Sequence, residues 1–352
     1  FWHRAQYIRS CWQRHHFRHS LAVHLTEKAS LHGKSESHLQ EIALRRGGIG
    51  YKLMTKQTLP DVAKETHAER FAPIDWVGMG AIELPVILKQ ADGQYRIPAR
   101  VDAKVSLDKK PSRGIHMSRL YLLSQEMMTK SELTLGLLGT VTSEFLRTHE
   151  DLSTRALVQV QFEAPLVRKA LKSSNQAWRS YPVVLSAFNE NGKISHFAEV
   201  IVTYSSTCPA SAALSRQLIQ DGFKQQFSSD QTLDFDIVHA WLGTPQGIVA
   251  TPHAQRSFAR VKAEVGPDFQ YGDLIDVVEE ALQTAVQGAV KREDEQEFAL
   301  RNGQNLMFCE DAARRVKDAL DSKSAILDYV AEFSHVESLH PHNAVSHISK
   351  GL

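Results

Sequence analysis

The sequence predicts an α+β fold in which antiparallel sheets are backed by helices. Many short segments alternate apolar and polar residues, the pattern of a half-buried strand, and several longer segments carry apolar residues at helical spacing. The pair Asn191-Gly192 lies between two of the strand patterns and is a strong signal for a tight hairpin. A hairpin joins antiparallel strands, and strands with one buried face are typical of antiparallel sheets. Both observations therefore favour antiparallel sheets.

The first half of the chain, from Trp76 onward, contains four clear strand patterns and one helix pattern. The helix pattern covers residues 133–145, between the first two strands. The strands are expected at residues 101–107, 156–162, 183–187 and 198–204. This half therefore predicts antiparallel strands with a helix packed against them.

A second unit with a similar succession of elements follows. Strands are expected at residues 259–265 and 327–333, and helices at 274–285 and 312–320. The similarity favours a structural duplication, although no exact sequence repeat supports it. The segment from Asp221 to Gly247 reads as an irregular insertion between the helix predicted after Cys208 and the motif at residues 251–257, without an assigned role.

Composition limits the class of protein. The 352 residues include 42% hydrophobic and 23% charged residues, which is ordinary for a globular protein with one large core or two modest ones. No run approaches the roughly 18 apolar residues that a membrane span requires. Three widely spaced cysteines cannot form the disulfide framework of a small secreted domain. A reducing cytoplasm is the expected setting.

Residues 1–53 differ in charge from the rest of the chain. They contain nine Lys or Arg against three Asp or Glu, whereas the whole chain has a net charge of +1. A targeting peptide or a nucleic-acid arm could have this composition. The segment lacks an amphipathic pattern, and Met54 with the residues after it looks like the ordinary start of a protein. We expect residues 1–53 to be a disordered upstream extension outside the functional fold.

Cys208 stands where a strand pattern gives way to a helix pattern. Pro209 suits the first turn of a helix, where a missing N–H does no harm. Cys208 would then face the positive end of the helix dipole, which favours the thiolate needed for metal ligation or nucleophilic attack. Position alone leaves open the alternative of a buried structural cysteine.

Other polar residues occur where a core would not require them. His253 follows a proline just before a strand, although a surface-loop histidine fits the same pattern. Glu295 lies in a charge run, and such runs are usually solvated. Glu310 begins a predicted helix, where the dipole favours a carboxylate whatever its role. Cys309 is expected to be packed rather than reactive.

Two further motifs carry candidate binding groups. His340 and His342 bracket a proline after the last predicted strand, where they could be ligands, proton shuttles or exposed loop residues. The segment 114–119 contains His116 and Arg119 and has the serine, arginine and backbone N–H groups suited to phosphate oxygens. The chain contains no phosphate-binding loop of the Gly-x-x-x-x-Gly-Lys-Ser/Thr type.

A thiolate, an imidazole and a carboxylate together suit zinc or divalent iron or manganese. Cys208, His253 and Glu295 supply such a set and leave a fourth position for water, the arrangement of a catalytic metal site. Their wide separation in the sequence does not by itself establish that they meet.

The motifs resemble, in the same order, those of type IB GTP cyclohydrolases. The resemblance begins at Leu59 and covers about residues 58–345. The segments that carry it are residues 114–119, 207–211, 252–257, 292–295, 305–311 and 337–342. Residues 1–53 have no counterpart in the family pattern.

The resemblance implies a tunnelling fold (T-fold) with two tandem modules, residues 54–207 and 208–352, assembled into a homotetramer. It implies conversion of GTP and water to 7,8-dihydroneopterin triphosphate and formate. This reaction is the first step of folate synthesis, and in many bacteria its product also supplies queuosine synthesis. GTP is the implied partner, with neither nucleic acid nor a membrane.

The resemblance also assigns roles to residues. Cys208, His253 and Glu295 match the ligands of a divalent zinc, manganese or iron ion that activates water, and Glu310 matches the anchor of the guanine edge. Proton transfer falls to His340 or His342. The implied triphosphate contacts are His116, Arg119 and Arg256.

Two departures from the family pattern leave alternatives open. Ala210 stands where the family usually has a second cysteine, and residues 172–176 lack its usual Pro-Val-Ser-Gly loop. One alternative is a reductase of the same fold that acts on a deazapurine nitrile through a cysteine nucleophile without metal. The other is a purine-binding regulator that has lost turnover. The set of Cys208, His253 and Glu295 favours the hydrolase.

Overall fold

The computed structural model describes residues 72–90 and 93–352, which belong to a single unit of the chain. The predictions for residues 1–53 lie outside these ranges. Among the described residues, no helix is long and apolar enough to cross a membrane.

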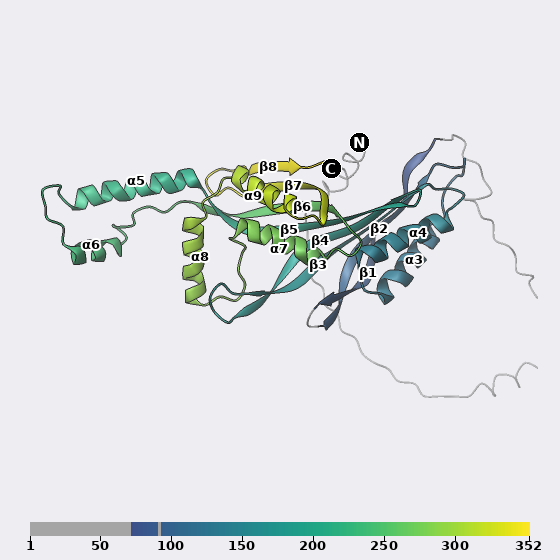
Figure 1. Ribbon diagram of the computed structural model, residues 1–352, viewed down its shortest axis with the longest axis horizontal. Helices are drawn as coiled ribbons and strands as arrows, with labels where there is room; N and C mark the ends of the chain where they lie inside the picture. The colour runs from purple at the N-terminus through teal and green to yellow at the C-terminus, as the bar shows by residue number, and fades with distance from the viewer. Residues whose placement is uncertain (1–71, 91–92) are drawn as a thin grey trace, which may run out of the picture. The chain divides into compact units, whose positions relative to one another are not determined.

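Eight strands form one antiparallel sheet in sequence order, so each strand pairs with the strand that precedes it and the strand that follows it (Figure 1). Less exposed and more exposed residues alternate along most of the strands, as the predicted period of two requires. The strands are β1 (Ile74–Gln90), β2 (Gly93–Leu107), β3 (Arg155–Lys169), β4 (Gln176–Glu190), β5 (Lys193–Thr207), β6 (Ala254–Val265), β7 (Ile326–His335) and β8 (Ala344–Ser349).

Four helices cover the buried face of this sheet. Helices α3 and α4 pack on the strands of the first half, while α7 and α9 pack on β5, β7 and β8 (Figure 1). The predicted α+β class, with antiparallel strands and helices on one face, is confirmed. The helices are α3 (Met117–Lys130), α4 (Leu135–Thr148), α5 (Pro209–Gln226), α6 (Phe235–Leu242), α7 (Tyr271–Leu282), α8 (Arg292–Gln304) and α9 (Cys309–Asp321).

The hairpin between β4 and β5 forms at the predicted position. Asn191 and Gly192 both have positive φ, 51° and 90°, which is the requirement of the tight turns that match the twist of the strands. Glu190 pairs with Lys193 across the turn. The Asn189 side chain accepts a hydrogen bond from the Gly192 N–H. This hairpin joins the two halves of the chain into one continuous sheet.

The order strand, strand, helix, helix, strand, strand occurs twice. It runs β1-β2-α3-α4-β3-β4 and then, apart from the inserted helices α5, α6 and α8, β5-β6-α7-α9-β7-β8. Such a repeat agrees with the expected duplication. The expected module boundary between Thr207 and Cys208 stays a prediction; that position lies between the end of β5 and the start of α5.

Several elements differ from the sequence predictions. The segment 114–119, expected to be a loop, runs into α3, and the charge run at 291–295 begins α8. The segment 221–247, expected to be irregular, contains the end of α5 and all of α6. The strand at 327–333 is not the last, because β8 follows it. Helix α8 lacks the apolar periodicity on which the predictions depended, because its one buried residue is Asp294.

Residues 209–252, which we call the arm, connect β5 to β6 and contain α5 and α6. The two helices extend beyond the end of the sheet (Figure 1). They are held together by edge-to-face and tilted ring contacts among Phe223, Phe227 and Trp241. Phe227 and Trp241 are buried, so the arm has a small apolar cluster of its own.

Candidate active site

Cys208 lies at the junction between β5 and α5, as the sequence predicts. It is the N-cap of α5, with Pro209 in the first turn, and its Sγ accepts a hydrogen bond from the Ser211 N–H at 3.5 Å. The thiol is free and partly exposed. A cysteine at a helix N-terminus with access to solvent is available as a ligand or a nucleophile.

His253 lies beside Cys208 although the arm separates them in sequence. The Cys208 N–H donates to the His253 carbonyl at 3.2 Å, and the His253 N–H donates to the Ser211 hydroxyl at 3.1 Å. These bonds extend the pairing of β5 with β6, in which Thr207 faces Ala254. Two of the three predicted metal ligands therefore meet at one end of the sheet.

A chain of polar side chains supports the His253 ring. Nδ1 of His253 is 3.0 Å from Oε1 of Gln255, and Nε2 of Gln255 donates to the Ser206 hydroxyl at 2.9 Å. Ser206 in turn shares a hydrogen bond with Ser257 at 2.8 Å. Gln255 is 8% exposed and both serines are fully buried. The ring of His253 is therefore held by side chains that are almost completely shielded from water.

The motif after β7 reaches the same place. The Val336 N–H donates to the Arg256 carbonyl at 3.2 Å, which extends the β6–β7 pairing. An oxygen of Glu337 then lies 3.9 Å from Nδ1 of His253. His340 and His342 follow in the exposed connection to β8, with their rings stacked 5.0 Å apart.

The segment before α9 completes this end of the sheet. The Met307 N–H donates to the Thr207 carbonyl at 3.1 Å, which places the start of α9 near Cys208. Glu310 is exposed in the first turn of α9, and its charge acts on the buried His335. Cys309 is 3% exposed, and burial raises the pKa of its thiol. The prediction that Cys309 is packed is confirmed.

Glu295 does not join Cys208 and His253 in this structure. Its neighbour Asp294 is fully buried and accepts hydrogen bonds from the backbone of Lys172 and Ser173 and from the Ser173 hydroxyl. Glu295 itself is exposed in the first turn of α8. In the part of the chain that the structure describes, no three His, Cys, Asp or Glu side chains are placed to hold a metal ion.

Helix geometry explains the separation. The far end of α8 reaches the site, because the Ser205 hydroxyl donates to Asn302 at 2.6 Å. Glu295 and Asn302 lie two turns apart, or about 10 Å at 1.5 Å per residue. The first turn of α8 is instead fixed to the turn between β3 and β4 by Asp294.

The three predicted triphosphate contacts lie in two places. His116 is the N-cap of α3, and Arg119 donates to the Thr148 carbonyl at the end of α4. Helix α3 packs on β1 and β2, three to four strand spacings from β5, or roughly 15–20 Å. Arg256 is exposed on β6, opposite Ser205, and so lies next to the His253 region.

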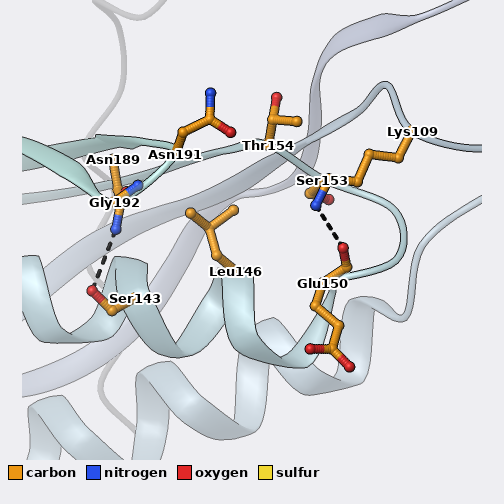
Figure 2. Close-up of a pocket in the computed structure, with 9 residues that line it drawn as sticks. All are labelled: Lys109, Ser143, Leu146, Glu150, Ser153, Thr154, Asn189, Asn191 and Gly192. Carbon is orange, nitrogen blue, oxygen red and sulfur yellow. Dashed lines mark hydrogen bonds between the residues drawn. The ribbon is translucent and has the colours of Figure 1, made fainter.

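A surface pocket of about 280 Å³ lies elsewhere, between the end of α4 and the β4–β5 turn (Figure 2). Its polar groups contact one another: Lys109 donates to the Glu150 carbonyl, and Asn189 donates to Ser143. None of the predicted site residues line it. We therefore place the candidate active site at the ends of β5, β6 and β7 rather than in this pocket.

The residues present partly fit a divalent cation. A thiol and an imidazole at the same end of the sheet are the soft and borderline donors that zinc or divalent iron accepts, and Glu337 adds a carboxylate behind the imidazole. Sequence reasoning gave no role to Gln255, Glu337 or Asp294. A signal was available only for Gln255, which lies in phase with the buried positions of β6, because a buried polar side chain needs a partner.

Cys208, His253 and Glu337 lie at one end of an antiparallel sheet, and a thiol, an imidazole and a carboxylate are the residue types from which the metal sites of hydrolytic enzymes are built. Comparison with known proteins gives the family. Residues 59–346 match the model of a protein family described as "Type I GTP cyclohydrolase folE2". The chain belongs to this type I GTP cyclohydrolase FolE2 family, and the predicted enzyme class is confirmed.

Curated relatives agree with this assignment. GTP cyclohydrolase FolE2 of Bdellovibrio bacteriovorus is 89% identical over 299 residues, which cover 85% of this chain and 98% of the relative. GTP cyclohydrolase FolE2 of Hydrogenovibrio crunogenus is 46% identical over 84% of this chain and 95% of its own length. Among the two enzyme alternatives, these matches favour the cyclohydrolase over the nitrile reductase.

Solved structures give a more distant similarity. A uricase from Arthrobacter globiformis aligns with a TM-score of 0.46 and 8% identity, over 80% of this chain and 94% of the uricase. This similarity is too distant to inform the chemistry.

Proposed function

We propose that this chain is a metal-dependent GTP cyclohydrolase of type IB that converts GTP and water to 7,8-dihydroneopterin triphosphate and formate. The reaction is the first step of folate synthesis and also supplies queuosine synthesis in organisms that make it. One observation carries the proposal: Cys208 and His253, far apart in sequence, are joined by a backbone hydrogen bond in a member of this family.

The proposed ligands are Cys208, His253 and Glu295. A divalent cation held there, whether zinc, manganese or iron, would supply an activated water for attack on C8 of the purine. The thiol and the imidazole lie together in one chain, whereas Glu295 has to be brought to them. The carboxylate of Glu337 is the alternative third ligand that the single chain offers.

The remaining site residues are proposed to bind and protonate the substrate. Glu310 is exposed at the start of α9, where its carboxylate can accept the paired N–H groups of guanine. His340 and His342 lie in an exposed loop and can transfer protons near neutral pH. His116, Arg119 and Arg256 are the proposed triphosphate contacts.

We also propose that the active form is a homotetramer in the cytoplasm, with neither nucleic acid nor a membrane as partner. The arm supports assembly, because it exposes several large apolar side chains although its inner face is already packed. Apolar groups gathered on one projecting segment are typical of protein interfaces. The most exposed are Phe235 (78%), Leu214 (63%), Val249 (57%), Ile237 (56%) and Leu218 (55%).

The activity test uses the full chain after removal of metal with a chelator. GTP is added with zinc, manganese or iron, while formate and the fluorescent oxidised pterin are measured. We expect turnover with at least one metal. No product with any metal would contradict the proposed reaction and leave the non-catalytic regulator as the interpretation.

The ligand test compares neighbouring carboxylates of one helix turn. Glu295→Gln should weaken zinc binding and abolish turnover, while Glu293→Gln, also exposed in the first turn of α8, should change neither. If Glu295→Gln leaves both zinc binding and turnover unchanged, Glu295 is not a ligand and the proposed trio is wrong.

The assembly test uses light scattering after size exclusion. The double substitution Leu214→Asp and Leu218→Asp should reduce the assembly below a tetramer. Leu122→Asp places a charge at an equally exposed position on α3 and should leave the assembly unchanged. A monomeric wild-type chain with full turnover would exclude a role for assembly.

A further inference from the structure

The ring of His253 has two oxygen atoms near one of its nitrogens. Oε1 of Gln255 lies 3.0 Å from Nδ1, and Oε2 of Glu337 lies 3.9 Å from it. A neutral imidazole has one N–H and one lone pair, so the nitrogen that carries the proton decides which nitrogen can bind a cation.

Gln255 alone does not decide this question. Its amide links Nδ1 of His253 to the Ser206 hydroxyl. A serine hydroxyl can donate or accept. If the amide were turned over, its NH₂ would donate to Nδ1, Ser206 would donate to the amide oxygen, and the proton would lie on Nε2. The chain of hydrogen bonds through Ser206 and Ser257 is compatible with either direction.

Glu337 removes the ambiguity. An ionised carboxylate only accepts hydrogen bonds, and its charge stabilises a proton on the nitrogen that faces it. With the amide turned over, the lone pair of Nδ1 would face a negative oxygen. The side chain of Glu337 is 15% exposed and that of His253 is 23% exposed, so water screens this contact only in part. A proton on Nδ1 satisfies both Gln255 and Glu337.

We propose that Gln255 and Glu337 are positioning residues that hold His253 with its proton on Nδ1 and leave Nε2 free to bind the divalent cation. This inference rests on the proposed function, in which His253 is a ligand. An outer partner of this kind fixes the orientation of a ligating histidine and makes it more basic. The buried serines Ser206 and Ser257 hold the Gln255 amide beside the ring of His253.

The first measurement reads the tautomer in the metal-free full chain. Long-range proton–nitrogen correlation spectra of protein with ¹⁵N-labelled histidine distinguish the two neutral forms, at a pH where imidazoles are neutral. The signal that disappears in His253→Ala belongs to this ring. We expect the proton on Nδ1. A proton on Nε2 in the wild-type chain overturns the proposal.

The second measurement is zinc affinity by competition with a chromophoric chelator. Gln255→Met keeps the volume but loses the acceptor, and the affinity should fall about 10- to 100-fold. Gln255→Glu keeps an acceptor and should restore the affinity to within a few-fold, which a purely structural role would not predict. Gln270→Met, at the N-cap of α7, is the matched control and should bind as the wild type does.

The outcomes separate this proposal from the proposed function. Unchanged zinc affinity in His253→Ala means that His253 is not a ligand, which overturns the ligand set and this inference with it. Normal affinity in a folded Gln255→Met overturns this inference alone. If Gln255→Met does not fold, Glu337→Gln replaces it, because Glu337 lies outside the strand. This substitution should shift the tautomer population of His253 toward the form with its proton on Nε2.

Discussion

The two halves of the sheet have the same order of elements but differ in their connections. In the first half, β2 follows β1 after two residues, and α4 follows α3 after a short turn. In the second half, the arm separates β5 from β6, and α8 separates α7 from α9. Cys208 and His253 are the residues at the two ends of the arm. The repeated elements supply the core, and the proposed active site lies where the second half departs from the first.

The largest effect should come from Cys208, at an end of the arm. Cys208→Ala should lower kcat/KM by more than the 10- to 100-fold loss typical of an outer partner, because it removes a proposed ligand. Cys309→Ala removes the buried thiol of α9 and should lower thermal stability while retaining most of the activity. Steady-state kinetics and thermal denaturation compare them; equal activity in both variants would contradict a special role for Cys208.

Core substitutions test whether the halves fold together. Phe145 of α4 and Leu320 of α9 are both fully buried, one in each half. Either residue changed to Ala should lower the free energy of unfolding by about 2–5 kcal/mol through the cavity it leaves. Because one sheet runs through both halves, we expect each variant to unfold in a single transition by circular dichroism and by fluorescence. Two separated transitions would show that the halves are independent.

Each half also contains a buried histidine whose pKa is lowered by folding. Burial lowers the pKa of His149 in the first half. Burial lowers the pKa of His335 in the second half to about 4, with the Glu310 charge opposing the shift. Between pH 6.5 and 4 the unfolded chain binds a proton at His335 that the folded chain does not.

Stability should therefore fall as the pH is lowered through this window, by up to about 3 kcal/mol from His335. His335→Gln should be less stable than the wild type at pH 7, because it loses the contact with Tyr204 at 2.9 Å. It should, however, show a smaller loss between pH 7 and 4.5 in denaturant titrations. An identical pH slope in both proteins would mean that folding does not lower the pKa of His335.

The smallest effect should come from the turn that joins the halves. Gly192 has a φ of 90°, which a side chain disfavours, so Gly192→Ala should lower stability by about 1 kcal/mol. A Cβ at Gly272, in the first turn of α7, meets no atom within 4 Å. Gly272→Ala should therefore be neutral or slightly stabilising in chemical denaturation. A neutral Gly192→Ala would indicate that the hairpin adopts another turn.

The sequence predicted most of the sheet because its strands have one buried face. The alternation at β5 and the proline after Cys208 located the junction of strand and helix. Helix α8 was missed because its one buried residue is Asp294, so it has no apolar stripe and reads as a solvated charge run. Strand β8 was missed because it is only six residues long and has no fully buried position.

The individual residues of the candidate site could be predicted, but not which of them lie together. Spacing along the chain cannot show that His253 pairs with Cys208, since that contact depends on strand register. The same limit explains Glu295, whose position follows from the hydrogen bonds that Asp294 makes to Lys172 and Ser173. Gln255 and Glu337 stood in the quoted motifs, but their roles emerge only from the distances to one ring nitrogen.

The hydrogen bond from Cys208 to His253 also has an evolutionary consequence. It closes the arm at its base, so the spacing of the two side chains is set by strand pairing rather than by the length of chain between them. Loop-closure entropy changes by only about 0.6 kcal/mol for each doubling of length. Insertions and deletions in the arm would therefore leave the pairing of Cys208 with His253 in place.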